Sequence, residues 1–310
     1  MNRTMKTFKI FSMAAVALCL AACSNSDDYS VQMPTQSADV LHFEAAVAAP
    51  NADATMRTVY TVDDTNIKVA WKDGDKIAVC ISGGKDSMLL AKCIQELHKY
   101  SDVKFDVVYL VMNPGYNEKN TQKIVSNAEL LNVPITIFES NIFECVEHIE
   151  DHPCYICARM RRGFLYKKAK ELGCNKIALG HHFDDVIETV LMGMFYGAQF
   201  QTMMPKVKST SHPGMELIRP LYYVKEADII NWMERNELEF IKCACKVTEK
   251  TELNGQDGTK RDEMKMLIKQ LRQAYKNIDM NIMRSTENVN LDTIISYRKN
   301  DEIHHFLEKY

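Results

Sequence analysis

Six consecutive residues that begin at Ser82 combine the groups that proteins use to hold the phosphates of a nucleotide. Two adjacent glycines let successive backbone N–H groups turn toward one anion, and the lysine that follows adds a full positive charge. The two serines can donate hydroxyl hydrogen bonds, and the aspartate suits Mg²⁺ or a helix cap. Against the alternative of a structural turn, we predict a phosphate-binding loop made of Ser82, Gly83, Gly84, Lys85, Asp86 and Ser87.

A second polar run, Gly180-His-His-Phe-Asp-Asp185, places two imidazoles and two carboxylates within six residues. Its first histidine, His181, can contact phosphate, and Asp184 or Asp185 can bind Mg²⁺ or cap the helix that follows. Helix capping alone is the structural alternative for one of the two acids. The residues that we expect to act in catalysis are Lys85, Asp86, Asp184 and Asp185.

The cysteines fall into groups by their sequence context. Four lie in apolar or helical stretches and are predicted to be buried small hydrophobes: Cys80, Cys93, Cys145 and Cys174. Cys154-Tyr-Ile-Cys157 and Cys243-Ala-Cys245 are the candidates for a metal or cluster site. By spacing alone, the first pair also fits a redox disulfide, half of a zinc site or a purely structural role.

Basic residues gather directly after the first cysteine pair, at Arg159, Arg161 and Arg162. At 3.6 residues per helical turn, the three arginines cannot all lie on one face of a helix. We expect Arg159, Arg162 and Tyr166 to share one side. The net charge of the chain is −3, so RNA binding would depend on such a local patch. A solvated face is the alternative to contact with RNA phosphates.

The elements that must position these residues alternate between short apolar runs and longer helical stretches, which is typical of a parallel α/β sheet. The run at 76–81 suits a strand buried on both faces, directly before the phosphate loop. We predict strands at 76–81, 105–112, 134–138 and 176–179, and helices at 88–97, 119–131, 158–172 and 184–196. This pattern predicts a doubly wound parallel sheet with ligands at the carboxyl ends of its strands.

The first quarter of the chain follows a different pattern. A basic stretch and an apolar run lead to Leu20-Ala-Ala-Cys23, which is similar to a bacterial lipobox and predicts a lipoprotein signal in residues 1–23. A buried N-terminal helix is the alternative. Residues 24–73 indicate a β-rich or disordered segment, weakly similar to surface proteins of the fimbrillin type, with short strands at 58–62 and 67–71.

Together, the phosphate loop, the GHH-x-DD run and the cysteines resemble the PP-loop ATPases, and most of all the tRNA 2-thiocytidine synthetase family. A C-x-x-C-x-R-x-R-R-G motif of that family matches residues 154–163, and an Arg-Pro-Leu motif matches 219–221. The resemblance covers roughly 75–310 and departs from the family at Phe183, where a basic residue is usual. It implies a sheet of the PP-loop (adenine nucleotide alpha hydrolase-like) type with C-terminal helices.

The resemblance also implies the ligands. In this family the two cysteines of the motif and a third cysteine after the last strand hold a [4Fe–4S] cluster. This assigns the cluster to Cys154, Cys157 and Cys243, with Cys245 as a rival for the third ligand. Three thiolates leave one iron open to incoming sulfur. ATP, Mg²⁺ and the cluster are therefore the implied cofactors.

The implied activity is ATP-dependent tRNA thiolation. The enzyme would adenylate C2 of the cytidine at position 32 in the anticodon loop and replace its oxygen by sulfur. A cysteine desulfurase or another sulfur donor and the tRNA are the implied partners, and the arginines at 159, 161 and 162 would bind the tRNA. Synthesis of 2-thiouridine or lysidine on the same fold is a rival, and a non-enzymatic surface lipoprotein is the alternative from another class. The oligomeric state stays open, with a homodimer among the expectations.

These features divide the sequence into four parts. They are a signal at 1–23, the surface-protein-like segment at 24–73, a PP-loop ATPase domain with the cysteine site at 74–248, and a helical tail at 249–310. The enzyme portion predicts a cytoplasmic protein, whereas the lipobox predicts membrane-anchored export. A fusion of two reading frames joined near Trp71–Val79 would explain this conflict.

Overall fold

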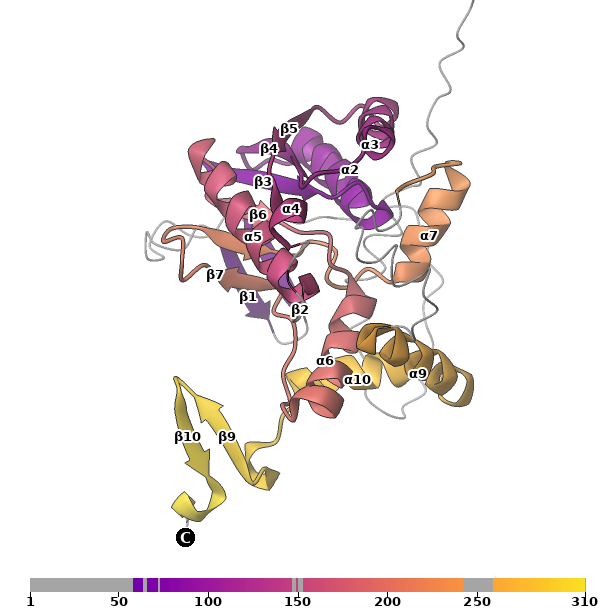
Figure 1. Cartoon of the computed structure of the whole chain (residues 1–310). Coiled ribbons are helices and arrows are strands. Elements are labelled where there is room, and N and C mark those ends of the chain that lie inside the picture. The colour runs from indigo at the N-terminus through magenta and orange to yellow at the C-terminus, as the bar shows by residue number, and fades with distance from the viewer. Residues whose placement is uncertain are drawn as a thin grey trace, which may run out of the picture. The chain divides into compact units, whose positions relative to one another are not determined.

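A computed structural model describes residues 58–63, 66–71, 73–146, 149, 153–241 and 259–309. The chain divides into two compact units (Figure 1), one made of 1–183 with 204–256 and the other of 184–203 with 257–310. The predicted lipoprotein signal, most of the segment at 24–73, and the residues Cys243 and Cys245 lie outside the described residues.

The first unit contains a six-stranded sheet in the order β5-β4-β3-β6-β8-β7. The neighbouring strands from β5 to β8 are parallel, and only β7 pairs antiparallel with its neighbour β8. The strands are β3 (Asp75–Ile81), β4 (Phe105–Asn113), β5 (Ile135–Glu139), β6 (Lys176–Ala178), β7 (Lys206–Lys208) and β8 (Glu216–Ile218). This largely parallel sheet confirms the predicted fold class.

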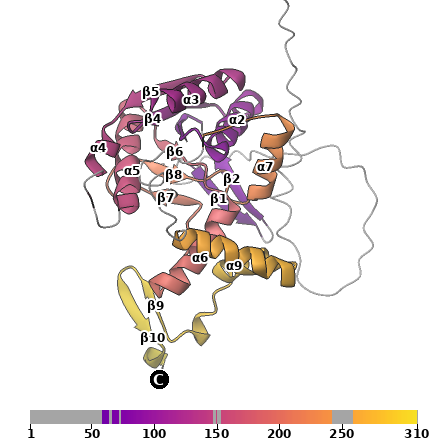
Figure 2. The ribbon, with the colours of Figure 1, turned by 45° about the vertical axis from the view of Figure 1, so that its right-hand side comes forward.

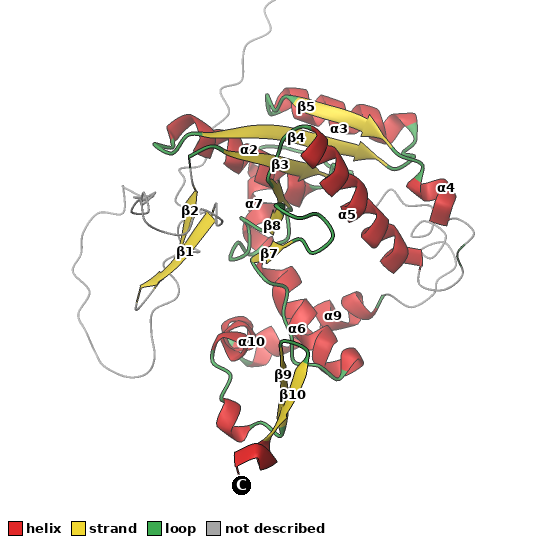
Figure 3. Ribbon diagram, turned by 90° about the vertical axis from the view of Figure 1, so that its left-hand side faces the viewer, coloured by secondary structure: helices red, strands yellow, loops and turns green. Residues whose placement is uncertain are grey.

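Helices cover both faces of the sheet, as a parallel sheet requires. They are α2 (Lys85–Tyr100), α3 (Glu118–Leu130), α4 (Ile142–Val146), α5 (Pro153–Glu171) and α7 (Glu226–Arg235). Side chains of β3 alternate between the two faces: Ile77 and Val79 pack in a core with α2, α3 and α7, whereas Ala78 and Cys80 pack in a core with α5. In Figure 3, α5 accordingly crosses one face while α2 and α3 lie behind the other.

Two hairpins form separate two-stranded sheets that are not hydrogen-bonded to the six-stranded sheet. The antiparallel strands β1 (Thr58–Asp63) and β2 (Asn66–Trp71) confirm the two short strands predicted before residue 73. Near the C-terminus, β9 (Ser296–Lys299) pairs with β10 (Glu302–His305). The expectation of a wholly helical tail is therefore wrong at its end, because the turn at Asn300 and Asp301 takes positive φ and returns the chain as a hairpin.

The second unit is mainly helical. It contains the helices α6 (Phe183–Gly197, which begins on the last residue of the first unit), α9 (Lys260–Ala274) and α10 (Ile278–Glu287), and the short helices η1 (Leu291–Thr293) and η2 (Phe306–Lys309). Figure 2 shows α6 and α9 side by side. Thr259 and Asp262 form a capping box that fixes the first turn of α9. Within the described ranges, no helix is long and apolar enough to cross a bilayer.

Candidate nucleotide and cysteine sites

The predicted phosphate loop lies at the point where the sheet reverses its strand order. From β3 the chain adds β4 and β5 on one side, and later β6 and β8 on the other. Ligands of open α/β sheets bind outside the carboxyl ends of the strands at such a switch point. The loop begins directly after Ile81, the last residue of β3, so the fold places it where the sequence analysis expected a ligand.

The second half of the loop is the first turn of α2, which begins at Lys85. Its backbone N–H groups have no earlier helical carbonyl to bind, and the helix dipole adds a partial positive charge there. Gly83 has φ +87, and a Cβ atom at this position would lie 2.6 Å from Ile124 Cγ1 and 2.8 Å from Ile241 Cδ1. The loop therefore requires glycine here for both its backbone conformation and its close packing.

The hydroxyl groups of Ser82 and Ser87 form hydrogen bonds within the phosphate loop. The N–H and Oγ–H groups of Ser82 each lie 3.2 Å from Ser87 Oγ, and the Ser87 hydroxyl donates to Gly84 O at 3.0 Å. Ser87 is buried. The two hydroxyls thus bond to the loop itself, and their predicted donation to phosphate stays a prediction.

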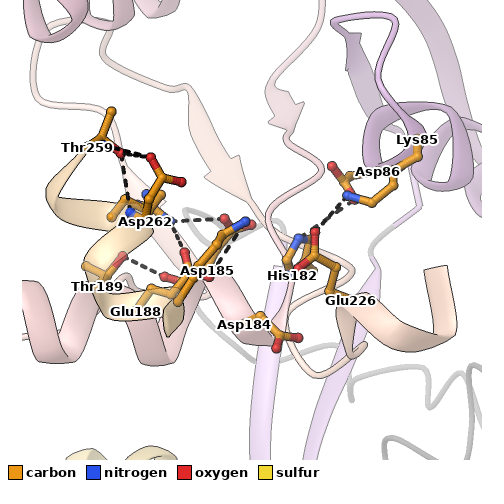
Figure 4. Close-up of polar contacts among 12 residues, drawn as sticks. Lys85, Asp86, His182, Asp184, Asp185, Glu188, Thr189, Glu226, Thr259 and Asp262 are labelled. Atoms are coloured by element: carbon orange, nitrogen blue, oxygen red, sulfur yellow. Dashed lines mark hydrogen bonds and ion pairs between the residues drawn. The ribbon is translucent and has the colours of Figure 1, made fainter. Parts of the chain in front are cut away.

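Lys85 lies among carboxylates (Figure 4). Its Nζ atom is 3.0 Å from Asp86 Oδ1 and 3.0 Å from Glu226 Oε1, the latter from the first residue of α7. Burial alone lowers the pKa of the Lys85 amine, but the two carboxylates outweigh burial and raise that pKa above its ordinary value. Lys85 therefore carries a full positive charge at the mouth of the loop.

The loop after β6 packs directly against the phosphate loop. A Cβ atom on Gly180 would lie 3.0 Å from the carbonyl carbon of Asp86 and 3.0 Å from the backbone nitrogen of Ser87, so only glycine allows this approach. His182 is buried, and its Nε2 lies 3.7 Å from Asp86 Oδ1. His181, the histidine favoured by the sequence analysis, is partly exposed beside it.

The two acids of the GHH-x-DD run belong to the second unit. Asp184 accepts from Arg272 at 2.5 Å, and Asp185 accepts from Arg261 at 3.1 Å. Both arginines come from α9, and Arg261 also reaches Glu188 at 2.7 Å. Burial raises the pKa of Glu188 to about 7, against the effect of the basic residues beside it. Asp184 and Asp185 therefore pair with α9 in this structure, and their roles in Mg²⁺ binding and catalysis stay predictions.

The first cysteine pair opens α5. Cys154 and Cys157 lie three residues apart in the first turns of this helix, which brings both onto one helix face. Cys157 is buried in an apolar cluster with Met112 of β4 and with Ile142, Phe143 and Val146 of α4.

The other cysteines separate into two kinds. Cys80 and Cys174 are buried, as predicted. Cys93 is only partly buried, short of its predicted burial. Burial raises the pKa of Cys80 and that of Cys93 to about 12, which disfavours the reactive thiolate form. Cys145 is exposed, and its predicted burial is wrong because it faces outward from the short helix α4, whose apolar side is formed by other residues.

The arginines after the cysteine pair point in different directions. Arg159 and Arg162 are exposed, as RNA contact would require. Arg161 is half-buried and donates to the Tyr116 hydroxyl at 3.0 Å, so it turns inward. Tyr166 is buried and stacks on His212, and the charge of Arg162 still reaches its hydroxyl, so it lies near Arg162 as expected but is not exposed.

Sequence reasoning missed Glu226 and Tyr116. An acid in the first turn of a helix is common at caps, so Glu226 carries no signal of its long-range contact with Lys85. Tyr116 lies between the end of β4 and the start of α3, at the carboxyl edge of the sheet. Its place after a predicted strand, where ligands bind in such sheets, was the only sequence signal for Tyr116.

Comparisons with known proteins agree with this geometry. A family model described as a PP-loop domain matches residues 56–251. The tRNA-cytidine(32) 2-sulfurtransferase of Neisseria gonorrhoeae is 39% identical over 189 residues, which are 59% of this chain and 57% of that protein. The protein of the same name from Paraburkholderia xenovorans is 34% identical over 224 residues, or 70% of this chain and 63% of that protein.

The chain thus spans less than two thirds of the length of these curated relatives. Among solved structures, the U34-tRNA thiolase NcsA from Methanococcus maripaludis with its [4Fe–4S] cluster aligns with a TM-score of 0.55 and 22% identity. That alignment covers 70% of this chain and 72% of the thiolase, and it supports the fold. Since the PP-loop domain model covers well over half of the sequence, the chain belongs to the PP-loop family.

Proposed function

We propose that this protein is an ATP-dependent tRNA sulfurtransferase that adenylates C2 of a cytidine in the anticodon loop and replaces its oxygen by sulfur. One observation carries the proposal. Cys157 packs against Met112 near the carboxyl end of β4, the strand next to β3, which leads into the phosphate loop. The predicted phosphate loop and Cys157 therefore lie toward the same edge of one sheet, in a chain similar to tRNA-cytidine(32) 2-sulfurtransferases.

In the first step, ATP would bind with its phosphates on the loop at Ser82–Ser87. The C2 oxygen of the cytidine would attack the α-phosphate, and pyrophosphate would leave. Lys85 would exchange a carboxylate partner for phosphate oxygens and balance the charge of the leaving group. Asp86 has a partly exposed carboxylate beside this amine, which suits it to hold Mg²⁺ with the pyrophosphate oxygens.

The cysteine sequence pattern and the burial of Cys157 support the proposed cluster. Cys154 and Cys157 both lie in the first turns of α5, and Cys157 is buried in an apolar cluster. Cys154, Cys157 and Cys243 would hold a [4Fe–4S] cluster, with Cys245 as the rival third ligand. When bound, the cluster would supply a site that accepts the incoming sulfur. Attack of sulfide-level sulfur on C2 would release AMP, which carries away the former C2 oxygen.

The anticodon loop suits this chemistry because its bases are exposed without opening a duplex. Position 32 is the position in the names of the relatives, and a cysteine desulfurase or free sulfide would provide the sulfur. A tRNA substrate favours a cytoplasmic site of action for this part of the chain. The rival 2-thiouridine activity would use the same site, so only the modified nucleoside distinguishes the two.

The experiment is to purify the full chain without oxygen, measure its iron, and incubate it with tRNA, ATP and sulfide. We expect about four irons per chain and 2-thiocytidine in the digested tRNA. Lys85→Ala should abolish thiolation while keeping the iron, because the loop and the cysteines are separate features. Cys157→Ala should lose the iron while ATP still binds. A colourless zinc protein, active in air, would contradict the cluster, and 2-thiouridine in place of 2-thiocytidine would contradict the substrate.

The exposed arginines give a test of tRNA contact. Arg159→Glu combined with Arg162→Glu should weaken tRNA binding and reduce the slope of log Kd against log salt by about two, since each lost phosphate contact removes roughly one unit. Binding measured by filter retention at several salt concentrations checks this. Lys104→Glu, an exposed change at the amino end of the sheet, is the matched control. An unchanged slope would mean that the two arginines form only a solvated face.

A further inference from the structure

Tyr116 and Arg161 connect the two halves of the proposed site. The Arg161 Nη2 group donates to Tyr116 Oη at 3.0 Å, and the Tyr116 hydroxyl lies 3.4 Å from the carbonyl oxygen of Ser82. Ser82 is the first residue of the phosphate loop, and Arg161 lies one helical turn after Cys157 on the same face of α5. A chain of two hydrogen bonds thus runs from the cysteine helix to the phosphate loop.

The protein holds Tyr116 in place from its backbone. Asn113 Oδ1, at the end of β4, accepts from the backbone N–H of Tyr116 at 2.7 Å and from that of Gly115 at 3.1 Å. The carbonyl of Pro114 accepts from the N–H of Phe143 at 3.0 Å, which ties the same loop to α4. Such local side-chain bonds fix a loop without the support of a sheet ladder.

One aromatic ring positions both partners of the hydrogen bond. The rings of Phe143 and Tyr116 meet edge to face with their centroids 5.8 Å apart, and the guanidinium carbon of Arg161 lies 5.7 Å from the centre of the Phe143 ring. Phe143 is itself buried in the apolar cluster that contains Cys157. Edge-to-face and cation–π contacts fix the orientations of the rings and of the guanidinium.

The two hydrogen bonds differ in strength. The arginine is always charged, and its bond to the tyrosine oxygen makes the tyrosine a stronger donor. The second bond, to Ser82, is long for an O–H···O contact. Because Ser82 belongs to the phosphate loop, a nucleotide bound there would act on the longer of the two bonds.

We propose that Tyr116 and Arg161 are positioning residues that couple occupancy of the phosphate loop to the placement of Cys157. The proposal rests on the thiolation function, because only that reaction needs the adenylated base and the sulfur site at a fixed separation. Arg161 then acts inside the protein, whereas Arg159 and Arg162 remain the residues for tRNA.

The test uses the full chain without its cluster and measures the rate at which iodoacetamide alkylates Cys157, with and without Mg²⁺-ATP, by mass spectrometry. We expect ATP to change the wild-type rate by about fivefold, the low end of coupling between two sites. In Tyr116→Phe the ring and its contact with Phe143 remain, so the protein should fold and bind ATP, but the ATP effect should fall close to none. Tyr100→Phe, at an exposed tyrosine on α2, is the matched control and should keep the wild-type ATP effect.

A double-mutant cycle strengthens the test. Arg161→Lys keeps the charge but loses the planar guanidinium, and it should reduce the ATP effect as Tyr116→Phe does. If Tyr116 and Arg161 act together through their hydrogen bond, the double variant should lose no more of the ATP effect on alkylation than either single variant. With the loaded enzyme, Tyr116→Phe should lower kcat for thiolation about tenfold or more and leave the KM for ATP nearly unchanged, as expected for misplaced reacting groups.

Three outcomes overturn the coupling: no ATP effect on wild-type alkylation, an equal effect in wild type and Tyr116→Phe, or additive effects in the double variant. These outcomes are separate from failure of the proposed function. If the proposed function is wrong, the wild-type protein would make no thiolated tRNA. The alkylation measurement would still test the coupling through Tyr116 and Arg161.

Discussion

The two ends of the central sheet hold similar ion pairs in opposite surroundings. At the amino end, Lys176 has no exposed side-chain surface and lies 2.7 Å from Glu216 and 3.4 Å from Asp75. Lys206 reaches the same glutamate at 3.1 Å. At the carboxyl end, Lys85 makes two contacts of 3.0 Å, but its side chain and those of its partners are about one quarter exposed.

The two sets of charges differ in whether their members can exchange one ion-pair partner for another. Charges sealed from water cannot lose a partner without leaving another charge buried, so the amino-end cluster is fixed to the fold. Charges at a partly open surface can change partners at a cost of about 1 kcal/mol or less. The comparison indicates that burial, more than distance, separates a structural ion pair from one that a ligand can replace.

The largest expected effect comes from Lys176→Ala. This change leaves Glu216 and Asp75 buried without their central cation, and removal of one partner of a buried ion pair typically costs about 3–5 kcal/mol. Unfolding in urea, followed by circular dichroism, should show this loss, whereas Lys104→Ala at the exposed surface nearby should change little. A loss below about 1 kcal/mol would mean that the cluster behaves like a surface pair.

The pH dependence offers a second measure of the same cluster. Burial raises the pKa of the Glu216 carboxyl, but Lys176 and Lys206 outweigh burial and hold that pKa below its ordinary value. A depressed folded-state pKa stabilises the protein above the unfolded value of about 4.3, and this contribution is lost as the pH falls through the folded pKa. Glu216→Gln should therefore be less stable than wild type at pH 7, with the difference shrinking below about pH 4.3.

At the carboxyl end, Gly180→Ala should have the next largest effect. The added methyl group would lie 3.0 Å from backbone atoms of α2, so the loop after β6 must move away from the phosphate loop. We expect a stability loss of about 1–3 kcal/mol and a fall in ATP-dependent activity of up to about a hundredfold. Gly163→Ala on α5 is the control, because a Cβ atom there meets open space. Equal activity of the two variants would show that the close approach is unimportant.

The smallest effect is expected for Glu226→Gln. This change removes one carboxylate that competes with phosphate for Lys85, so the pKa of Lys85 should fall toward its ordinary value and ATP should bind about twofold to fivefold more tightly. Titration calorimetry with Mg²⁺-ATP measures this. Weaker binding would instead mean that Glu226 holds Lys85 in the orientation that phosphate needs.

The sequence predicted the parts of the fold that depend on local pattern. Apolar runs identified β3 and β4, and helical spacing identified α3, because each signal lies within its own element. The three-residue strands β7 and β8 were missed, since such short strands form through pairing with distant neighbours. The hairpin at β9 and β10 was missed because its turn has the sequence Asn-Asp in place of Asn-Gly.

For the candidate site, the sequence predicted which residues gather but not how they pair. The motif order placed the phosphate loop and the Gly180 loop at neighbouring strand ends, and the structure brings them into contact. It gave no indication that Arg161 turns inward or that Asp184 binds Arg272. Those contacts join residues 45 and 88 positions apart, so they depend on tertiary packing.

The strand order of the sheet has a consequence for how the protein folds. Ile77 of β3 pairs with Val107, which is 30 residues later, and on its other side with Lys176, which is 99 residues later. Closing the longer loop costs more chain entropy, and contacts between distant residues form slowly. During synthesis, β3 and β4 can pair as soon as both have left the ribosome, whereas the Gly180 loop, Glu226 and Ile241 arrive later. The contacts around the phosphate loop are therefore completed late, and a nascent chain that stops before β6 lacks all three.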